Sequence, residues 1–126
     1  MEKMPAGIKG AWVENKRAVG SRYEAEAAVF LEKLGYKILE QNYRDRLGEI
    51  DIVAREGAYL VFVEVKYRKD GRCGHPEEAV AGRKQQRIRH TARYYLYSHQ
   101  YGEDTACRFD VVSIDGDRIR VVRDAF

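Results

Sequence analysis

The chain has 126 residues, a formal net charge of +3, 44% hydrophobic residues and 34% charged residues. This length and composition fit one globular domain with a densely charged surface. Apolar runs stay well short of the roughly 18 residues that a membrane span needs, the start lacks a signal-peptide core, and two cysteines are too few for a disulfide framework. We therefore expect a soluble cytoplasmic protein with no membrane partner.

Positive charge is concentrated in residues 67–100, which hold eight Lys and Arg against three Asp and Glu. Such a segment suits a polyanionic partner, because Lys and Arg that neutralise phosphates release condensed counterions. A basic helix face that is simply solvated would give the same composition. Charge alone leaves both interpretations open.

The chain divides into residues 1–16, an N-terminal arm without clear periodicity, and residues 17–126, a single domain. A first helix begins near Val19, and Gly35 provides its C-terminal stop. Its apolar positions at helical spacing are Ala27, Phe30, Leu31 and Leu34.

Alternating and β-branched runs predict strands over 36–44, 48–55, 59–68, 107–114 and 117–123. Between the third and fourth strands, a helix is expected from about Glu77 to Gln100. Its apolar stripe consists of Ile88, Ala92, Tyr95 and Leu96. The order α-β-β-β-α-β-β predicts an α/β fold with a mixed five-stranded sheet flanked by helices.

The second and third strands form a hairpin that places charged side chains opposite one another. With residues 57–58, Gly-Ala, at the centre of a type II′ turn, Asp51 faces Glu64. In the same register Glu49 faces Lys66 as its expected salt-bridge partner. Side chains alternate along a strand, so the opposite face should be core. Its residues are Ile50, Ile52, Ala54, Val61, Val63 and Val65.

Two carboxylates that face each other next to a buried region repel, and partial burial increases the cost. A cation must offset this repulsion. Lys66 is one such cation, and a divalent metal is another, since Mg²⁺ prefers carboxylate oxygens. The alternative is an ordinary cross-strand salt-bridge cluster on a solvated patch.

The runs GEIDIVA and LVFVEVKYR resemble the PD-(D/E)xK nuclease signature, with Asp51, Glu64 and Lys66 at its acidic and basic positions. Ile50 stands where the signature has Pro. Across residues 17–114 the chain resembles the YraN family of endonuclease-like bacterial proteins. The wider superfamily is similar in fold to restriction endonucleases and archaeal Holliday-junction resolvases. The resemblance implies a restriction-endonuclease-like fold and metal-dependent cleavage of nucleic acid, with DNA, branched DNA included, as the favoured substrate.

The resemblance also implies roles for individual residues. Asp51, Glu64 and Glu24 would hold Mg²⁺ or Mn²⁺, and the backbone carbonyl of Val65 would complete the metal shell. Lys66 would orient the attacking water or stabilise the charge that develops on the phosphate.

Glu24 is the member of this set that comes from the first helix. It lies four residues after Gly20, where the family similarly has a glutamate, and it borders the packed helical stripe. Glu26 is a competitor for the same role. A solvated glutamate favoured by the helix dipole would also explain this position.

Basic and aromatic residues share one face of the second helix: Arg83, Arg87, His90, Tyr94 and Tyr97. Phosphate contacts from Arg83, Arg87 and the neighbouring Lys84 are expected, whereas the tyrosines either stack on bases or pack against the core. Asp110 is expected to be a structural partner for an arginine. The alternative function is a non-catalytic nucleic-acid-binding or scaffold protein that retains a nuclease fold. A homodimer is also left open, since resolvases need two sites to cut opposed strands.

Overall fold

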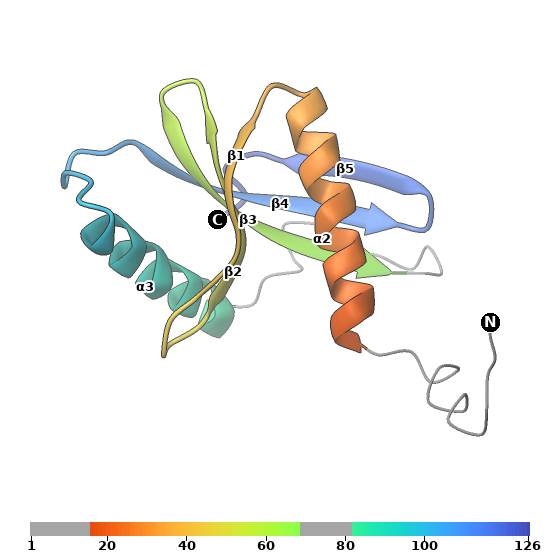
Figure 1. The fold of residues 1–126 in the computed structure, drawn as a ribbon, viewed down its shortest axis with the longest axis horizontal. Helices are drawn as coiled ribbons and strands as arrows, with labels where there is room; N and C mark the ends of the chain where they lie inside the picture. Colours follow the sequence, from red (N-terminus) through yellow and green to blue (C-terminus); the bar gives the residue numbers. More distant parts are fainter. Residues whose placement is uncertain (1–15, 69–81) are drawn as a thin grey trace.

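A computed structural model describes residues 16–68 and 82–126 (Figure 1). The elements are α2 (Lys16–Lys33), β1 (Lys37–Arg44), β2 (Glu49–Glu56), β3 (Tyr59–Arg68), α3 (Gly82–Ser98), β4 (Cys107–Asp115) and β5 (Arg118–Val122). This order confirms the predicted α-β-β-β-α-β-β sequence. The expected arm lies outside the described residues apart from Lys16, which begins α2, and so does the start of the expected second helix before Gly82.

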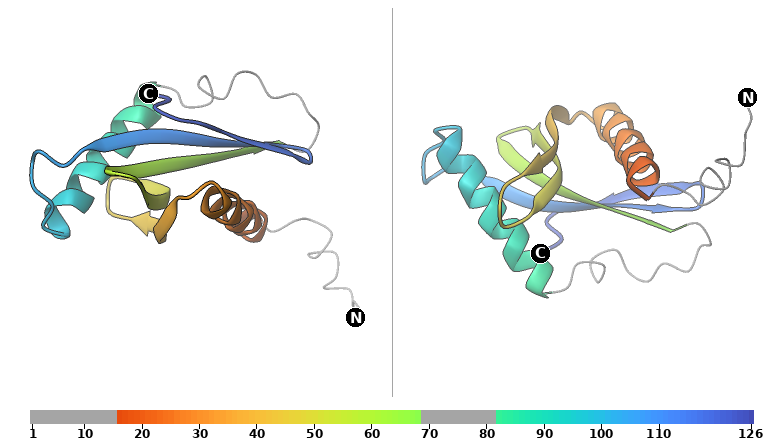
Figure 2. Two further views of the ribbon diagram at one scale, coloured as in Figure 1. Left: turned by 90° about the horizontal axis from the view of Figure 1, so that it is seen from above. Right: turned by 60° about the horizontal axis from the view of Figure 1, so that its bottom comes forward.

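The five strands form one mixed sheet in the order β1-β2-β3-β4-β5. Neighbouring strands pair antiparallel except for β3 and β4, which run parallel. Parallel neighbours need a crossover connection, and α3 is part of the segment that joins these two strands. In both views of Figure 2, β1 and β2 lie between the two helices.

Two apolar clusters bury the sheet, one with each helix. The α2 cluster contains Ala27, Ala28, Leu31, Tyr36, Ile52, Ala54, Val61, Val63, Val65, Val112 and Ile114. The α3 cluster contains Ile50, Val53, Leu60, Phe62, Ile88, Ala92, Tyr95 and Val111. Residues of β4 alternate between the clusters, as expected for a sheet that is covered on both faces. No helix in the two described ranges is long and apolar enough to span a membrane.

The β2–β3 hairpin has the predicted register. Glu56 pairs with Tyr59 across the two turn residues, and the ladder continues to the pair of Ile52 and Val63. Gly57 has φ +59°, whereas Ala58 is not among the residues with positive φ. This combination fits a type II′ turn, in which glycine takes the first central position.

One prediction for this hairpin was wrong: Ile50 does not share a face with Ile52. It packs in the α3 cluster, whereas Ile52 packs in the α2 cluster. The paired ladder with β3 ends at Ile52. On the other side of β2, Ile52 pairs with Gln41 and Ile50 pairs with Tyr43 of β1, and Asn42 between these two β1 residues has φ +56°. Asn tolerates this left-handed conformation, which interrupts the alternation so that Tyr43 and Ile50 both turn toward α3.

A buried charged network supports the region near the β2–β3 turn. Asp110 is fully buried and accepts hydrogen bonds from the Tyr36 hydroxyl at 2.7 Å, from Arg108 Nε at 2.9 Å and Nη2 at 2.8 Å, and from the Asp124 backbone N at 3.0 Å. Arg108 also donates to Glu56. The prediction that Asp110 partners an arginine is confirmed, and its role here is structural.

Candidate functional site

Charged side chains from both helices and three strands line a cleft of about 960 Å³. Its acidic residues are Glu24, Asp45, Glu49, Asp51 and Glu64. Its basic residues are Arg44, Arg46, Lys66, Arg68, Lys84 and Arg87. Acidic groups at a basic rim favour a ligand that combines a cation with phosphate groups.

Asp51 lies where β2 and β3 separate. Its Oδ2 accepts a hydrogen bond from the Val65 backbone N at 2.8 Å. If the β2–β3 ladder continued, the Val65 N–H would donate to the main-chain carbonyl of Ile50. The Asp51 carboxylate takes the place of this backbone acceptor. Burial, and then the nearby charge of Glu64, raises the pKa of Asp51 to about 9. The carboxyl is therefore fixed in position and destabilised as an anion unless a cation approaches.

Glu24 and Glu49 bring two more carboxylates to Asp51. One oxygen of each of the three residues lies within 4.8 Å of the others. Glu24 Oε1 is buried and has no hydrogen-bond partner, and burial together with the charge of Glu49 raises the pKa of Glu24. Three clustered carboxylates, one of them with an unpartnered buried oxygen, fit the oxygen-ligand chemistry of a hard divalent cation. Glu26, the alternative to Glu24, is exposed and does not line the cleft.

Glu49 does not have the partner that the hairpin register predicted. Its Oε2 lies 3.8 Å from Arg44 Nη2, and it pairs with Arg44 across β1 and β2. Lys66 instead lies beside Glu64. The reason is that the β2–β3 ladder ends at Ile52, after which β2 follows β1 alone. This separation keeps Glu49 away from Lys66 and places it in the carboxylate cluster, with Arg44 as its ion-pair partner.

Glu64 is buried and held by two lysines. Its Oε2 forms an ion pair with Lys84 Nζ and lies 3.5 Å from Lys66 Nζ. Burial, and then the charge of Lys84, lowers the pKa of Lys66. For Lys84, burial lowers the pKa, but the Glu64 carboxylate outweighs this effect and the net shift is upward. The predicted residues Asp51, Glu64, Lys66 and Glu24 thus meet in one cleft, with Glu64 outside the tightest carboxylate group.

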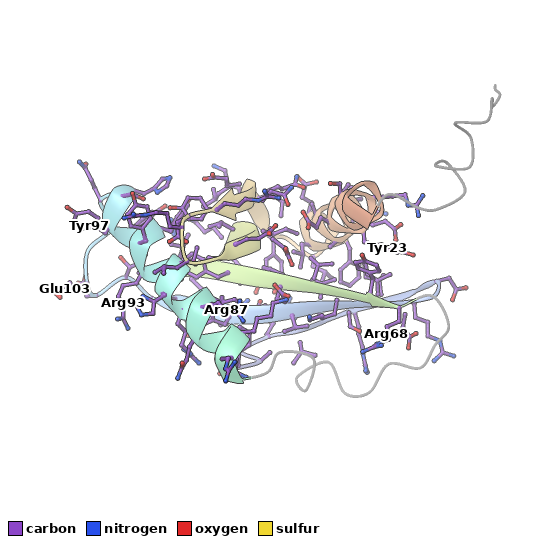
Figure 3. All side chains as sticks on the ribbon, turned by 90° about the horizontal axis from the view of Figure 1, so that it is seen from below. Tyr23, Arg68, Arg87, Arg93, Tyr97 and Glu103 are labelled. Atoms are coloured by element: carbon purple, nitrogen blue, oxygen red, sulfur yellow. The ribbon has the colours of Figure 1, made fainter. Side chains whose placement is uncertain are left out.

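The predicted phosphate-binding residues divide into two groups. Lys84 and Arg87 line the cleft, whereas Arg83 is exposed on α3 outside the lining. Arg44, Arg46 and Arg68 are lining residues that sequence reasoning missed. Figure 3 labels Arg87 on α3 and Arg68 at the end of β3. Arg44 and Arg46 flank Asp45 next to the hairpin that carries the acidic residues, and this position in the sequence could have identified them. No local pattern distinguished Arg68.

The β1–β2 loop is fastened to α3 beside the carboxylates. Asp45 Oδ1 accepts hydrogen bonds from the backbone N of Leu47 at 2.8 Å, from that of Gly48 at 2.9 Å, and from Thr91 Oγ1 at 3.3 Å. A Cβ at Gly48 would lie 3.1 Å from Thr91 Oγ1 and 3.7 Å from Arg87 Cβ. Glycine thus allows the loop to approach the helix closely. An Asp followed by Gly three residues later is a turn signal that could have identified this anchor.

Comparison with known proteins places the chain among bacterial relatives. The model of the uncharacterised protein family UPF0102 matches residues 23–114. A UPF0102 protein of Lachnoclostridium phytofermentans is 55% identical over 112 residues, covering 89% of this chain and 95% of the relative. UPF0102 protein YraN of Salmonella typhi is 41% identical over 127 residues, covering 100% of this chain and 97% of the relative. The chain therefore belongs to the uncharacterised protein family UPF0102, which includes YraN.

Proposed function

We propose that this protein is a metal-dependent endonuclease that hydrolyses phosphodiester bonds of nucleic acid, with DNA as the favoured substrate. The observation that supports this proposal most directly is the group of carboxylates from Glu24, Glu49 and Asp51. One oxygen of each lies within 4.8 Å of the others, in the cleft that Glu64 and Lys66 also line. The spacing of Asp51, Glu64 and Lys66 and the mixed sheet with flanking helices support a restriction-endonuclease-like fold of the PD-(D/E)xK superfamily.

Glu24 and Asp51 are the residues best suited to hold Mg²⁺ or Mn²⁺, with Glu49 as a further carboxylate. Glu64 and the backbone carbonyl of Val65 line the same cleft and join the set through the family resemblance. Such an ion, when bound, lowers the pKa of a water molecule and offsets phosphate charge.

The protein's own residues supply the remaining chemistry. Lys66 Nζ, partly buried and with a lowered pKa, lines the cleft beside Glu64, where it would orient water or stabilise developing negative charge on the phosphate. Lys84 and Arg87 neutralise neighbouring phosphates from α3, and Arg44 and Arg46 do so from the β1–β2 side. Asp51 stays oriented through its bond from the Val65 N–H.

A non-catalytic nucleic-acid-binding protein is the second candidate. The observation that favours it is the double pairing of Glu64 with Lys84 and Lys66, which satisfies this carboxylate without a metal. Such a protein would keep the basic rim and the fold but leave phosphodiester bonds intact.

A cleavage assay separates the two candidates. Branched, flapped and single-stranded DNA, and RNA, are incubated with Mg²⁺ or Mn²⁺ and with wild type, Asp51→Asn, Glu64→Gln or Lys66→Ala. The endonuclease proposal predicts cleavage by wild type and a loss of at least about 100-fold in each variant, the magnitude typical for a group that stabilises transition-state charge. Equal residual cleavage by all four proteins would identify a contaminant and refute the proposal. Binding without cleavage would establish the second candidate.

A further inference from the structure

Among the helices and strands of the described part of the chain, α3 has the largest excess of one charge. Over Gly82–Ser98 it has no Asp or Glu. Its basic residues are Arg83, Lys84, Arg87, Arg89 and Arg93. A helix of this composition has no acidic side chains of its own to pair these cations. It attracts a polyanion over the stretch from Arg83 to Arg93, in which Lys84 is already paired with Glu64.

Two tyrosines lie exposed on the same helix. Tyr94 is 51% exposed and Tyr97 is 80% exposed, the highest value among the exposed large hydrophobic residues of the described ranges. Their ring centroids are 6.5 Å apart with an interplanar angle of 43°. Tyr95, between them, is buried and packs edge-on against Tyr43 and Phe62. Tyr95 therefore packs in the core, and the exposed rings of Tyr94 and Tyr97 are available to a ligand.

These rings lie along one flank of α3 that begins at the cleft. Arg87, His90, Tyr94 and Tyr97 follow at intervals of four and three residues, which places them on one side of a helix. Arg87 lines the cleft, and Tyr97 lies ten residues further along, about 15 Å at a helical rise of about 1.5 Å per residue. Arg89 belongs to the other flank, where it covers the rings of Phe109 and Phe126. Figure 3 labels Arg87 and Tyr97 toward opposite ends of the helix.

We propose that this flank of α3 is a track for single-stranded nucleic acid, with unpaired bases stacked on Tyr94 and Tyr97 and phosphates led by Arg87 into the cleft. Aromatic rings beside cations are the elements that bind single strands independently of sequence. Bases within a duplex are stacked on one another and do not offer a free face to a tyrosine ring. The inference rests on the proposed function only for the direction of the track, which ends at the carboxylates.

The test is a binding measurement in EDTA, where no cleavage takes place. Fluorescence anisotropy compares three probes of equal length: labelled oligothymidine of 20 nucleotides, the same phosphate backbone without bases, and a 20-base-pair duplex. Proteins are wild type, Tyr94→Ala, Tyr97→Ala, Tyr97→Trp and the control Tyr59→Ala. Tyr59 is also an exposed tyrosine, 43% exposed, but it lies at the β2–β3 turn.

Wild type should bind oligothymidine about tenfold more tightly than the base-free backbone, and more tightly than the duplex, because only unpaired bases reach the rings. Tyr94→Ala and Tyr97→Ala should each weaken oligothymidine binding about tenfold and leave base-free binding unchanged. Tyr97→Trp should retain affinity, and Tyr59→Ala should match wild type. Thermal unfolding of every variant excludes a loss of fold as the cause.

Equal binding of oligothymidine by wild type and both alanine variants would overturn the track, and so would a preference of wild type for the duplex or the base-free backbone. These outcomes are separable from those for the nuclease. Tyrosine-dependent binding without cleavage in Mg²⁺ would refute the proposed endonuclease while keeping the track. Cleavage with tyrosine-independent binding would do the reverse.

Discussion

The Asp51 carboxylate stands in for a main-chain carbonyl, because its Oδ2 accepts the Val65 N–H at 2.8 Å where the hairpin ladder has ended. This bond fixes the carboxylate beside Glu24 and Glu49. Burial and mutual repulsion make the cluster costly in the absence of a cation. Carboxyl groups with a strongly raised pKa that line a cleft are typical of functional sites.

Asp51→Asn should stabilise the metal-free protein by about 1 kcal/mol, since the buried carboxyl must take up a proton on folding at neutral pH, whereas the neutral amide does not and its oxygen still accepts the Val65 N–H. Urea unfolding in EDTA measures this difference, with Asp117→Asn, an exposed site, as the control that should change little. Added Mn²⁺ should raise the free energy of unfolding of wild type but not of Asp51→Asn. A variant less stable than wild type in EDTA would mean that the carboxylate is a structural group.

Gly48→Ala should lower cleavage about tenfold and cost about 1–2 kcal/mol of stability, because the added Cβ would lie 3.1 Å from Thr91 Oγ1. The β1–β2 loop, and with it Arg46, would move away from α3. Gly82→Ala is the matched control, since no atom of the described residues, apart from its chain neighbours and its own helix backbone, lies within 4 Å of its added Cβ. Cleavage rates at saturating metal and thermal unfolding provide the two readouts. Unchanged cleavage in Gly48→Ala would show that the loop position does not matter to the site.

Asp110→Ala should destabilise the protein by about 3–5 kcal/mol, because it leaves Arg108 and Tyr36 without their buried acceptor. Urea denaturation gives the size of the loss. Tyr36→Phe removes a single hydrogen bond from the same carboxylate and should cost only about 1 kcal/mol. Similar losses for both variants would contradict the view that Asp110 holds the network together.

Glu56 should make stability depend on acid pH. Hydrogen bonds from Arg123 and Arg108 lower its pKa from 4.5 to about 2. Its contribution is therefore complete above about pH 4.5 and is lost as pH falls toward about 2. Glu56→Gln should be about 2 kcal/mol less stable than wild type at pH 7, and this gap should narrow across that window. Glu103→Gln, at an exposed site, serves as the control; a constant gap at Glu56 from pH 7 to pH 2 would refute the assignment.

Local sequence patterns predicted most of the fold. Strand alternation, the Gly57 turn and the apolar stripe of α3 predicted the order of elements and the register from Glu56–Tyr59 to Ile52–Val63. The prediction failed where that register ends, at Ile50 and Glu49, because a period-two pattern assumes continuous pairing and does not anticipate the left-handed Asn42 or the separation of β2 from β3.

The site shows the same division. The signature residues Asp51, Glu64 and Lys66 could be selected from sequence, and they line one cleft with Glu24. The pairing of Glu64 with Lys84 could not be predicted, because it joins β3 to α3 across the sheet. Arg68 was missed for a similar reason, since its place in the lining depends on how the strand end lies against neighbouring elements.

The most direct test of the central claim, that the carboxylate cluster is a divalent-cation site, is calorimetric titration of Mn²⁺ into wild type and Asp51→Asn. Wild type should bind Mn²⁺, and the variant should bind it at least about tenfold more weakly, because Asp51 is the buried and fixed carboxylate of the group. Equal Mn²⁺ affinity in the two proteins, or no binding by wild type even with DNA present, would contradict the claim.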